Sequence, residues 1–68
     1  QTLVDHILRE DIRFILKQSG RMPQSVMEQV RVVERVAARL DYRALECREH
    51  ERAEMIDRAI QDVLHELG

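Results

Sequence analysis

Turn-forming residues are concentrated at one point of this chain. Its 68 residues include two glycines and one proline, and Gly20 and Pro23 fall together in the segment 19–25, Ser-Gly-Arg-Met-Pro-Gln-Ser. An all-β fold needs a turn roughly every 8–12 residues, so the sequence predicts an all-α domain. One helix is expected to end and another to begin within 19–25, because glycine suits a helix C-terminus and Ser25 suits an N-cap.

The part before this turn has the pattern of one amphipathic helix. Thr2 and Asp5 have the spacing of a capping box, and we expect a helix at about 2–18. Asp11 falls inside its apolar sector, where a carboxylate is costly unless it is paired. We therefore expect an arginine partner for Asp11, or a gap that exposes it. The apolar sector is unusually wide and comprises Leu3, Val4, Ile7, Leu8, Ile12, Phe14, Ile15 and Leu16.

The part after the turn contains no glycine or proline before the last residue. Ser25 and Glu28 fit the Ser-x-x-Glu capping box, so a second helix should begin at Val26. Two apolar stripes follow along the chain. The first consists of Val26, Val30, Val33, Ala37, Leu40, Ala44 and Cys47, and the second of Ala53, Ile56, Ile60, Val63 and Leu67. Nine residues separate Cys47 from Ile56, which is about 180° of rotation at about 100° per residue, so the apolar face changes sides.

This change of face indicates two separate helices, at 26–40 and 42–67. Asp41 is the expected N-cap of the last helix, and Leu40 and Leu45 have the spacing of a hydrophobic staple. The alternative is one bent helix whose opposite faces serve two partners. The fold class predicted for 1–68 is therefore a single all-α domain of three helices.

The aliphatic content exceeds what one small domain can bury. Hydrophobic residues make up 44% of the chain and aromatic residues only 3%, while a chain of this size buries roughly 60% of its unfolded surface. We expect the surplus to be buried in a helical-bundle homodimer. The predicted contact residues are Ile12, Ile15, Leu16, Val26, Val30, Val33 and Leu40.

A row of arginines repeats every four residues along the second predicted helix: Arg31, Arg35, Arg39 and Arg43. Such a row could contact phosphates or an acidic partner. The segment 12–30, an apolar helix followed by a glycine turn and a capped helix, also has the order of a helix-turn-helix opening, so a small DNA-binding regulator is the alternative function. Two observations count against DNA binding. Acidic residues, which repel phosphates, are dense from Leu45 onward, and the acids of the third helix can neutralise the arginines without a ligand. Nucleic acid is the less favoured partner.

Few residues suggest chemistry. Cys47 is the only cysteine, which excludes an internal disulfide or a four-cysteine zinc site and favours a reducing, cytoplasmic location. Asp62 and His65 have the spacing nearest to a bundle metal pair, but the second helix offers no facing carboxylate. No apolar run reaches the roughly 18 residues of a transmembrane helix. We expect no catalytic residue, cofactor, metal or membrane contact. The expected function is that of a protein-binding adaptor, anti-activator or assembly factor.

Overall fold

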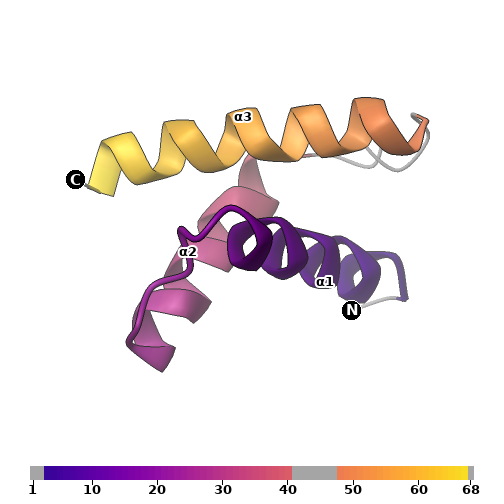
Figure 1. Ribbon diagram of the computed structural model, residues 1–68. Helices are drawn as coiled ribbons and strands as arrows, with labels where there is room; N and C mark the ends of the chain where they lie inside the picture. Colours follow the sequence, from indigo (N-terminus) through magenta and orange to yellow (C-terminus); the bar gives the residue numbers. More distant parts are fainter. Residues whose placement is uncertain (1–2, 41–47, 68) are drawn as a thin grey trace.

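Three helices make up the described part of the chain. The computed structural model describes residues 3–40 and 48–67, and it places α1 at Leu3–Gln18, α2 at Val26–Arg39 and α3 at Glu49–Leu67. The described residues contain no strand, so the predicted all-α class is confirmed. Each helix contacts the other two, and Figure 1 shows α2 rising behind α1 until its last turns reach α3.

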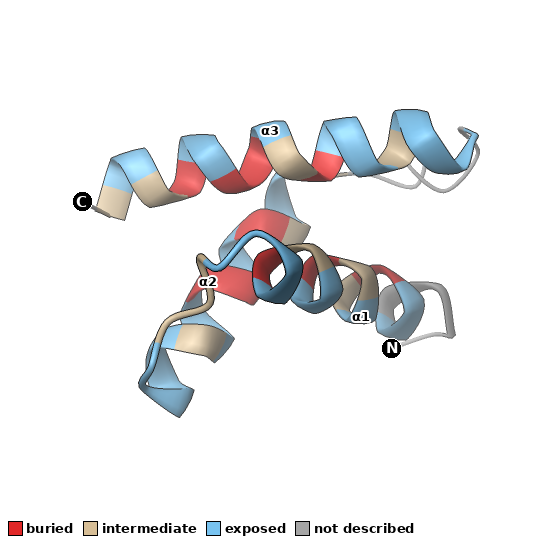
Figure 2. Cartoon of the chain, viewed as in Figure 1, coloured by how far each residue is buried: buried red, intermediate tan, exposed pale blue. Residues whose placement is uncertain are grey.

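The core is aliphatic and receives side chains from every helix. No polar side chain among the described residues is buried. Burial of each large aliphatic side chain stabilises the fold by about 1.5–3 kcal/mol. The red bands in Figure 2 show that the buried residues lie where the three helices face one another. They are Leu8, Ile12, Leu16, Val32, Val33, Val36, Ile56, Ala59, Ile60 and Val63.

The turn after α1 is a glycine-based helix cap. Gly20 has a φ of +70°, a conformation that glycine adopts without strain. Its backbone N–H donates to the carbonyl of Lys17 at 3.2 Å, and the N–H of Arg21 donates to the carbonyl of Leu16 at 3.0 Å. These two bonds form a Schellman motif, and they confirm that the first helix ends just before Gly20.

The N-terminus of α2 also lies where the sequence predicts it. Ser25 is the N-cap, and its side chain accepts a hydrogen bond from the backbone N–H of Glu28 at 3.5 Å. The connector before it is held in place because the side-chain amide of Gln29 donates to the carbonyl of Pro23 at 2.8 Å. The capped helix therefore begins at Val26.

The expectation of two separate helices is confirmed, but the predicted start of the last helix is wrong. Leu40 is extended, with φ −96° and ψ 148°, so α2 cannot run on as one bent helix. Arg48 is not helical, and its backbone N–H donates to the Glu51 carboxylate at 3.4 Å. This is the arrangement of a helix N-cap, and acids in the first turn favour a start there. The proposed cap Asp41 and the staple residue Leu45 lie outside the described residues.

At least one ion pair links each pair of helices. Arg9 of α1 binds Glu34 of α2 through two contacts of 2.7 and 2.8 Å. Arg52 of α3 lies 3.3 Å from Asp11 of α1. On the third side, Arg39 of α2 pairs with Glu66 of α3. Half-exposed pairs of this kind contribute little to stability, but they are present at all three interfaces between helices.

Within the described residues, no helix combines the length and the apolar character that crossing a bilayer requires.

Candidate protein-binding surfaces

The seven predicted contact residues divide into three groups. Ile12, Leu16 and Val33 lie in the core of the single chain, each at most 1% exposed. Ile15 and Leu40 are half-buried against the same core. Val26 and Val30 are 71% and 47% exposed.

The structure therefore corrects the prediction for α1. Part of the apolar sector of this helix, including Ile12 and Leu16, is buried against α2 and α3 of the same chain, while Ile7 and Phe14 of the sector stay exposed. The side chains of Ile12 and Leu16 leave no surface for a partner, and the same holds for Val33 on α2. A contact with another molecule has to use other residues.

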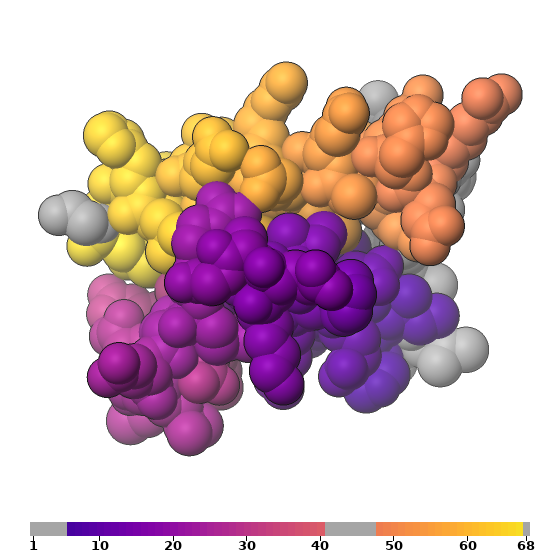
Figure 3. All heavy atoms as spheres, viewed as in Figure 1, coloured from indigo at the N-terminus to yellow at the C-terminus, as the bar shows by residue number. Residues whose placement is uncertain are grey.

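The start of α2 carries an exposed apolar surface, which we call the α2 knob and define as Val26, Met27 and Val30. Met27 is 82% exposed, the highest value among the large hydrophobic residues that are exposed. In Figure 1 this end of α2 lies away from both α1 and α3, and in Figure 3 it stands out at the lower left of the molecule. The α2 knob is thus a convex apolar surface on the part of the helix that extends past the core.

Helix propensity does not explain why valines stand at the exposed α2 knob. Valine lowers helix stability by a few tenths of a kcal/mol relative to alanine, and only packing offsets that loss. Val32 and Val36 gain such packing in the core, whereas Val26 and Val30 do not. Met27 adds a long and adaptable apolar side chain of the kind often found at binding surfaces.

The arginine row is paired inside the chain. Arg39 and Arg35 both face Glu66 of α3, Arg35 at 3.9 Å, while Arg31 lies 4.0 Å from Glu28. Neutralisation by acids of the third helix is therefore confirmed for Arg35 and Arg39. Arg43 lies outside the described residues. The side chains of Arg31 and Arg35 remain 57% and 52% exposed, so these pairs are loose surface contacts.

A second apolar surface is concave and lies between α1 and α3. We call it the α1–α3 groove and define it by Phe14, Ile15, Ala53 and Ile56. Its deeper end has a volume of about 130 Å³ and is bordered by Asp11, Glu49 and Arg52. Past Ile15 and Ala53 it continues into a shallower part beside Glu54, Asp57, Arg58 and Gln61. Phe14 is 61% exposed, so an aromatic ring on the wall of the groove is open to solvent.

Asp11 borders the deeper end of this groove and has the arginine partner that its position in α1 predicts. Its Oδ2 lies 3.3 Å from Nε of Arg52. That oxygen is buried but receives no hydrogen bond, because the two groups are close without being aligned. Among the described residues this oxygen therefore interacts only with Arg52, and it has no exposed surface to offer to another molecule.

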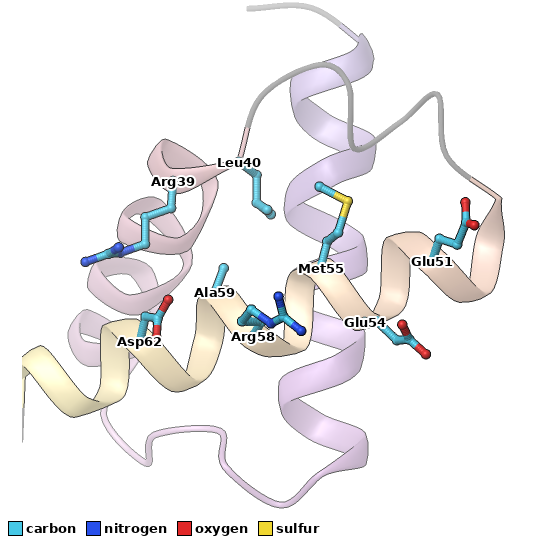
Figure 4. A pocket seen from close by; sticks show the side chains of 8 residues that line it. All are labelled: Arg39, Leu40, Glu51, Glu54, Met55, Arg58, Ala59 and Asp62. Carbon is cyan, nitrogen blue, oxygen red and sulfur yellow. The ribbon is translucent and has the colours of Figure 1, made fainter.

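A third hollow lies between the end of α2 and α3 (Figure 4). Leu40, Met55 and Ala59 form its apolar part, and charges of both signs surround them, from Arg39, Glu51, Glu54, Arg58 and Asp62. These side chains come from open surface and are not arranged as a nucleophile next to a base. The hollow therefore suggests no reaction.

The described residues also contain no group of three or more His, Cys, Asp or Glu side chains placed to hold a metal ion. Asp62 and His65, whose spacing suggested a metal pair, are both exposed on α3. Cys47 lies outside the described residues. No metal-dependent or thiol-dependent chemistry is inferred for this chain.

No protein-family model matches the chain, and searches of curated proteins and of solved structures found no significant match. Function is therefore inferred from the geometry of these surfaces.

Four residues of the α2 knob and the α1–α3 groove were not among the predicted contacts, namely Met27, Phe14, Ala53 and Ile56. Two of these are large and exposed hydrophobic residues. Met27 lies next to the valine stripe rather than on it, and Phe14 was counted with the apolar sector of α1. Both are exposed. The only sequence signal for Met27 was its place two residues after the N-cap Ser25, in the first turn of α2, which can extend past helices packed further along α2.

Proposed function

We propose that this chain is a non-enzymatic protein–protein interaction module, of an adaptor or assembly type, that associates with itself through the α2 knob. The observation that carries the proposal is the exposure of Val26, Met27 and Val30 at one end of α2, where Val26 and Val30 continue the stripe that forms the core further along and Met27 lies beside it. A reducing, cytoplasmic location is part of the proposal, because the chain has one cysteine.

The energetics favour a partner with its own apolar surface. Complete burial of a valine or methionine side chain is worth about 1.5–3 kcal/mol. Scaled by their exposed fractions, the three side chains of the α2 knob offer on the order of 4 kcal/mol per copy. Association itself costs about 4–15 kcal/mol. A stable complex therefore needs matching apolar area on the other molecule, and the association should be weak and concentration-dependent.

Interaction is favoured over catalysis because of how the charges are placed. The described arginines and carboxylates form ion pairs across helix boundaries or stand on open surface. Catalytic sites usually shift the pKa values of their groups by burial, and no charged side chain among the described residues is buried.

Sedimentation equilibrium from micromolar to millimolar concentration tests the proposal. The wild type should associate reversibly, and the double variant Met27→Gln with Val30→Gln should stay monomeric. Glutamine keeps the helix propensity of these positions high while it removes the apolar surface. Ala38→Gln, at an exposed position of the same helix, is the matched control and should associate like the wild type.

Two outcomes would overturn the proposal. One is a wild type that remains monomeric over the whole range. The other is a salt-sensitive gel shift with random duplex DNA that is lost in Arg35→Ala with Arg39→Ala, since binding of this kind would assign the exposed arginines to phosphate contacts.

A further inference from the structure

The α2 knob and the α1–α3 groove have opposite shapes and similar chemistry. The knob is convex, with Met27 and Val26 its most exposed side chains. The groove is concave, with apolar walls that include the exposed ring of Phe14, and its deeper end of about 130 Å³ has room for one aliphatic side chain. The two surfaces lie on different parts of the same molecule, so one copy cannot bring them together.

The charges beside these two surfaces are also complementary. Asp11 and Asp57 at the groove pair with Arg52 and Arg21 of the same chain. Glu49 and Glu54 also border the groove, and neither forms an ion pair with another described residue. Arg58 also lies on this border, so Glu49 and Glu54 leave the groove with a slight excess of carboxylates for a basic partner.

On the knob, a basic side chain is placed to meet them. Arg31 follows Met27 by four residues and so lies one turn further on the same face of α2. Its contact with Glu28 is 4.0 Å long, and more than half of each side chain is exposed. Pairs of this kind exchange partners at little cost, so Arg31 is available to a carboxylate of another molecule.

Building on the proposed function, we infer that the occupant of the α1–α3 groove is a second copy of this chain, bound head to tail through its α2 knob. Met27 or Val30 of one copy enters the deeper end of the groove of the next, and Arg31 approaches Glu49 or Glu54. A knob-to-knob contact would bring two convex surfaces together and leave Phe14 uncovered, so it buries less apolar area than the head-to-tail contact.

A head-to-tail contact has a different consequence from a two-fold one. Each copy in such an assembly uses its knob on one neighbour and its groove on another, so the assembly grows into open chains or closes into a ring. The homodimer expected from the sequence is then the smallest product of this association and not its end point.

A complementation experiment tests this inference. The knob variant is Met27→Gln with Val30→Gln, and the groove variant is Ala53→Gln, which places a longer side chain in the groove from an exposed helical position. Helical circular dichroism should first show that both variants fold. Each variant alone should be monomeric in sedimentation velocity, whereas an equimolar mixture should form a one-to-one heterodimer and nothing larger. The control Ala38→Gln should behave like the wild type.

The outcomes separate this inference from the proposed function. If Ala53→Gln associates like the wild type while the knob variant does not, self-association stands and the head-to-tail contact is overturned. A mixture of the two variants that stays monomeric overturns it as well. If the wild type itself never associates, the proposed function fails first.

A charge exchange examines the same contact independently. Arg31→Glu and Glu54→Arg should each weaken association several-fold when tested alone. A mixture of the two variants should recover most of the loss, because opposite charges meet again in both kinds of contact between unlike variants. Equal weakening in the mixture and in the single variants would contradict the assigned pairing.

Discussion

The two halves of α2 have similar sequences and opposite environments. Val26 and Val30 in the first half are 71% and 47% exposed, whereas Val33 and Val36 in the second half are at most 1% exposed. Both halves are helical and both are rich in valine. The difference shows that an apolar stripe predicts which face of a helix will be buried. The lengths of the neighbouring helices determine which part of that stripe is buried within the same chain.

The most severe way to probe this contrast is to place a charge in each half. Val36→Asp puts an unpaired carboxylate at a position with no exposure and should cost about 4 kcal/mol or more, comparable to the whole stability of a domain this small. Loss of helical circular dichroism at room temperature would register it. Val26→Asp should stay folded, because an acid in the first turn of a helix is mildly stabilising. If both variants unfold, the two halves do not differ as described.

A milder probe removes methyl groups from each half. Val36→Ala should lower the free energy of unfolding by roughly 2 kcal/mol, from lost burial and a residual cavity. Val30→Ala should change it by less than about 0.5 kcal/mol, because the site is half exposed and alanine has the higher helix propensity. Urea denaturation at low protein concentration measures both values without a contribution from association. Similar losses at the two positions would show that the start of α2 is packed after all.

The N-cap tests whether the α2 knob depends on an ordered first turn. Ser25→Ala removes the acceptor of the Glu28 N–H and should cost about 0.5–1 kcal/mol. Since Val26 and Met27 lie in that turn, the variant should also associate more weakly than the wild type. Ser25→Asp retains a capping side chain and serves as the control for both measurements. An unchanged association constant for Ser25→Ala would mean that the knob does not need its cap.

The smallest expected effect concerns the ion pair between α1 and α2. Glu34→Gln removes the carboxylate that binds Arg9 at 2.7 and 2.8 Å and should destabilise by about 0.5 kcal/mol, since both side chains are partly exposed. Glu10→Gln, on the exposed face of α1, should have no measurable effect. The difference between the two should shrink in high salt, which screens surface pairs. A loss that persists in high salt would contradict a purely electrostatic origin.

Local features were predictable from the sequence because they depend on neighbouring residues. The glycine cap at Gly20, the serine cap at Ser25 and the separation of α2 from α3 all follow from capping chemistry and from the change of apolar phase. The start of α3 was not predictable in the same way. A phase change of about 180° shows that a break occurs between two stripes, but it does not locate the break.

The binding surface was harder to predict than the fold. Periodicity places Ile12 and Leu16 on an apolar face. It does not show whether the surface that packs against this face belongs to the same chain or to another. Charge balance was more informative, since the acids of the third helix were expected to neutralise the arginine row, and Glu66 does so for Arg35 and Arg39. Phe14 and Met27 were missed because their exposure depends on how far the neighbouring helices extend.

The ion pairs between helices have a consequence for handedness. A bundle of three helices can be arranged with the third helix on either side of the first two. The mirror arrangement would turn the flank of each helix toward the wrong neighbour and separate Arg9 from Glu34, Asp11 from Arg52 and Arg39 from Glu66. Each pair contributes only about 0.2–1 kcal/mol, but together they favour the observed arrangement over its mirror image.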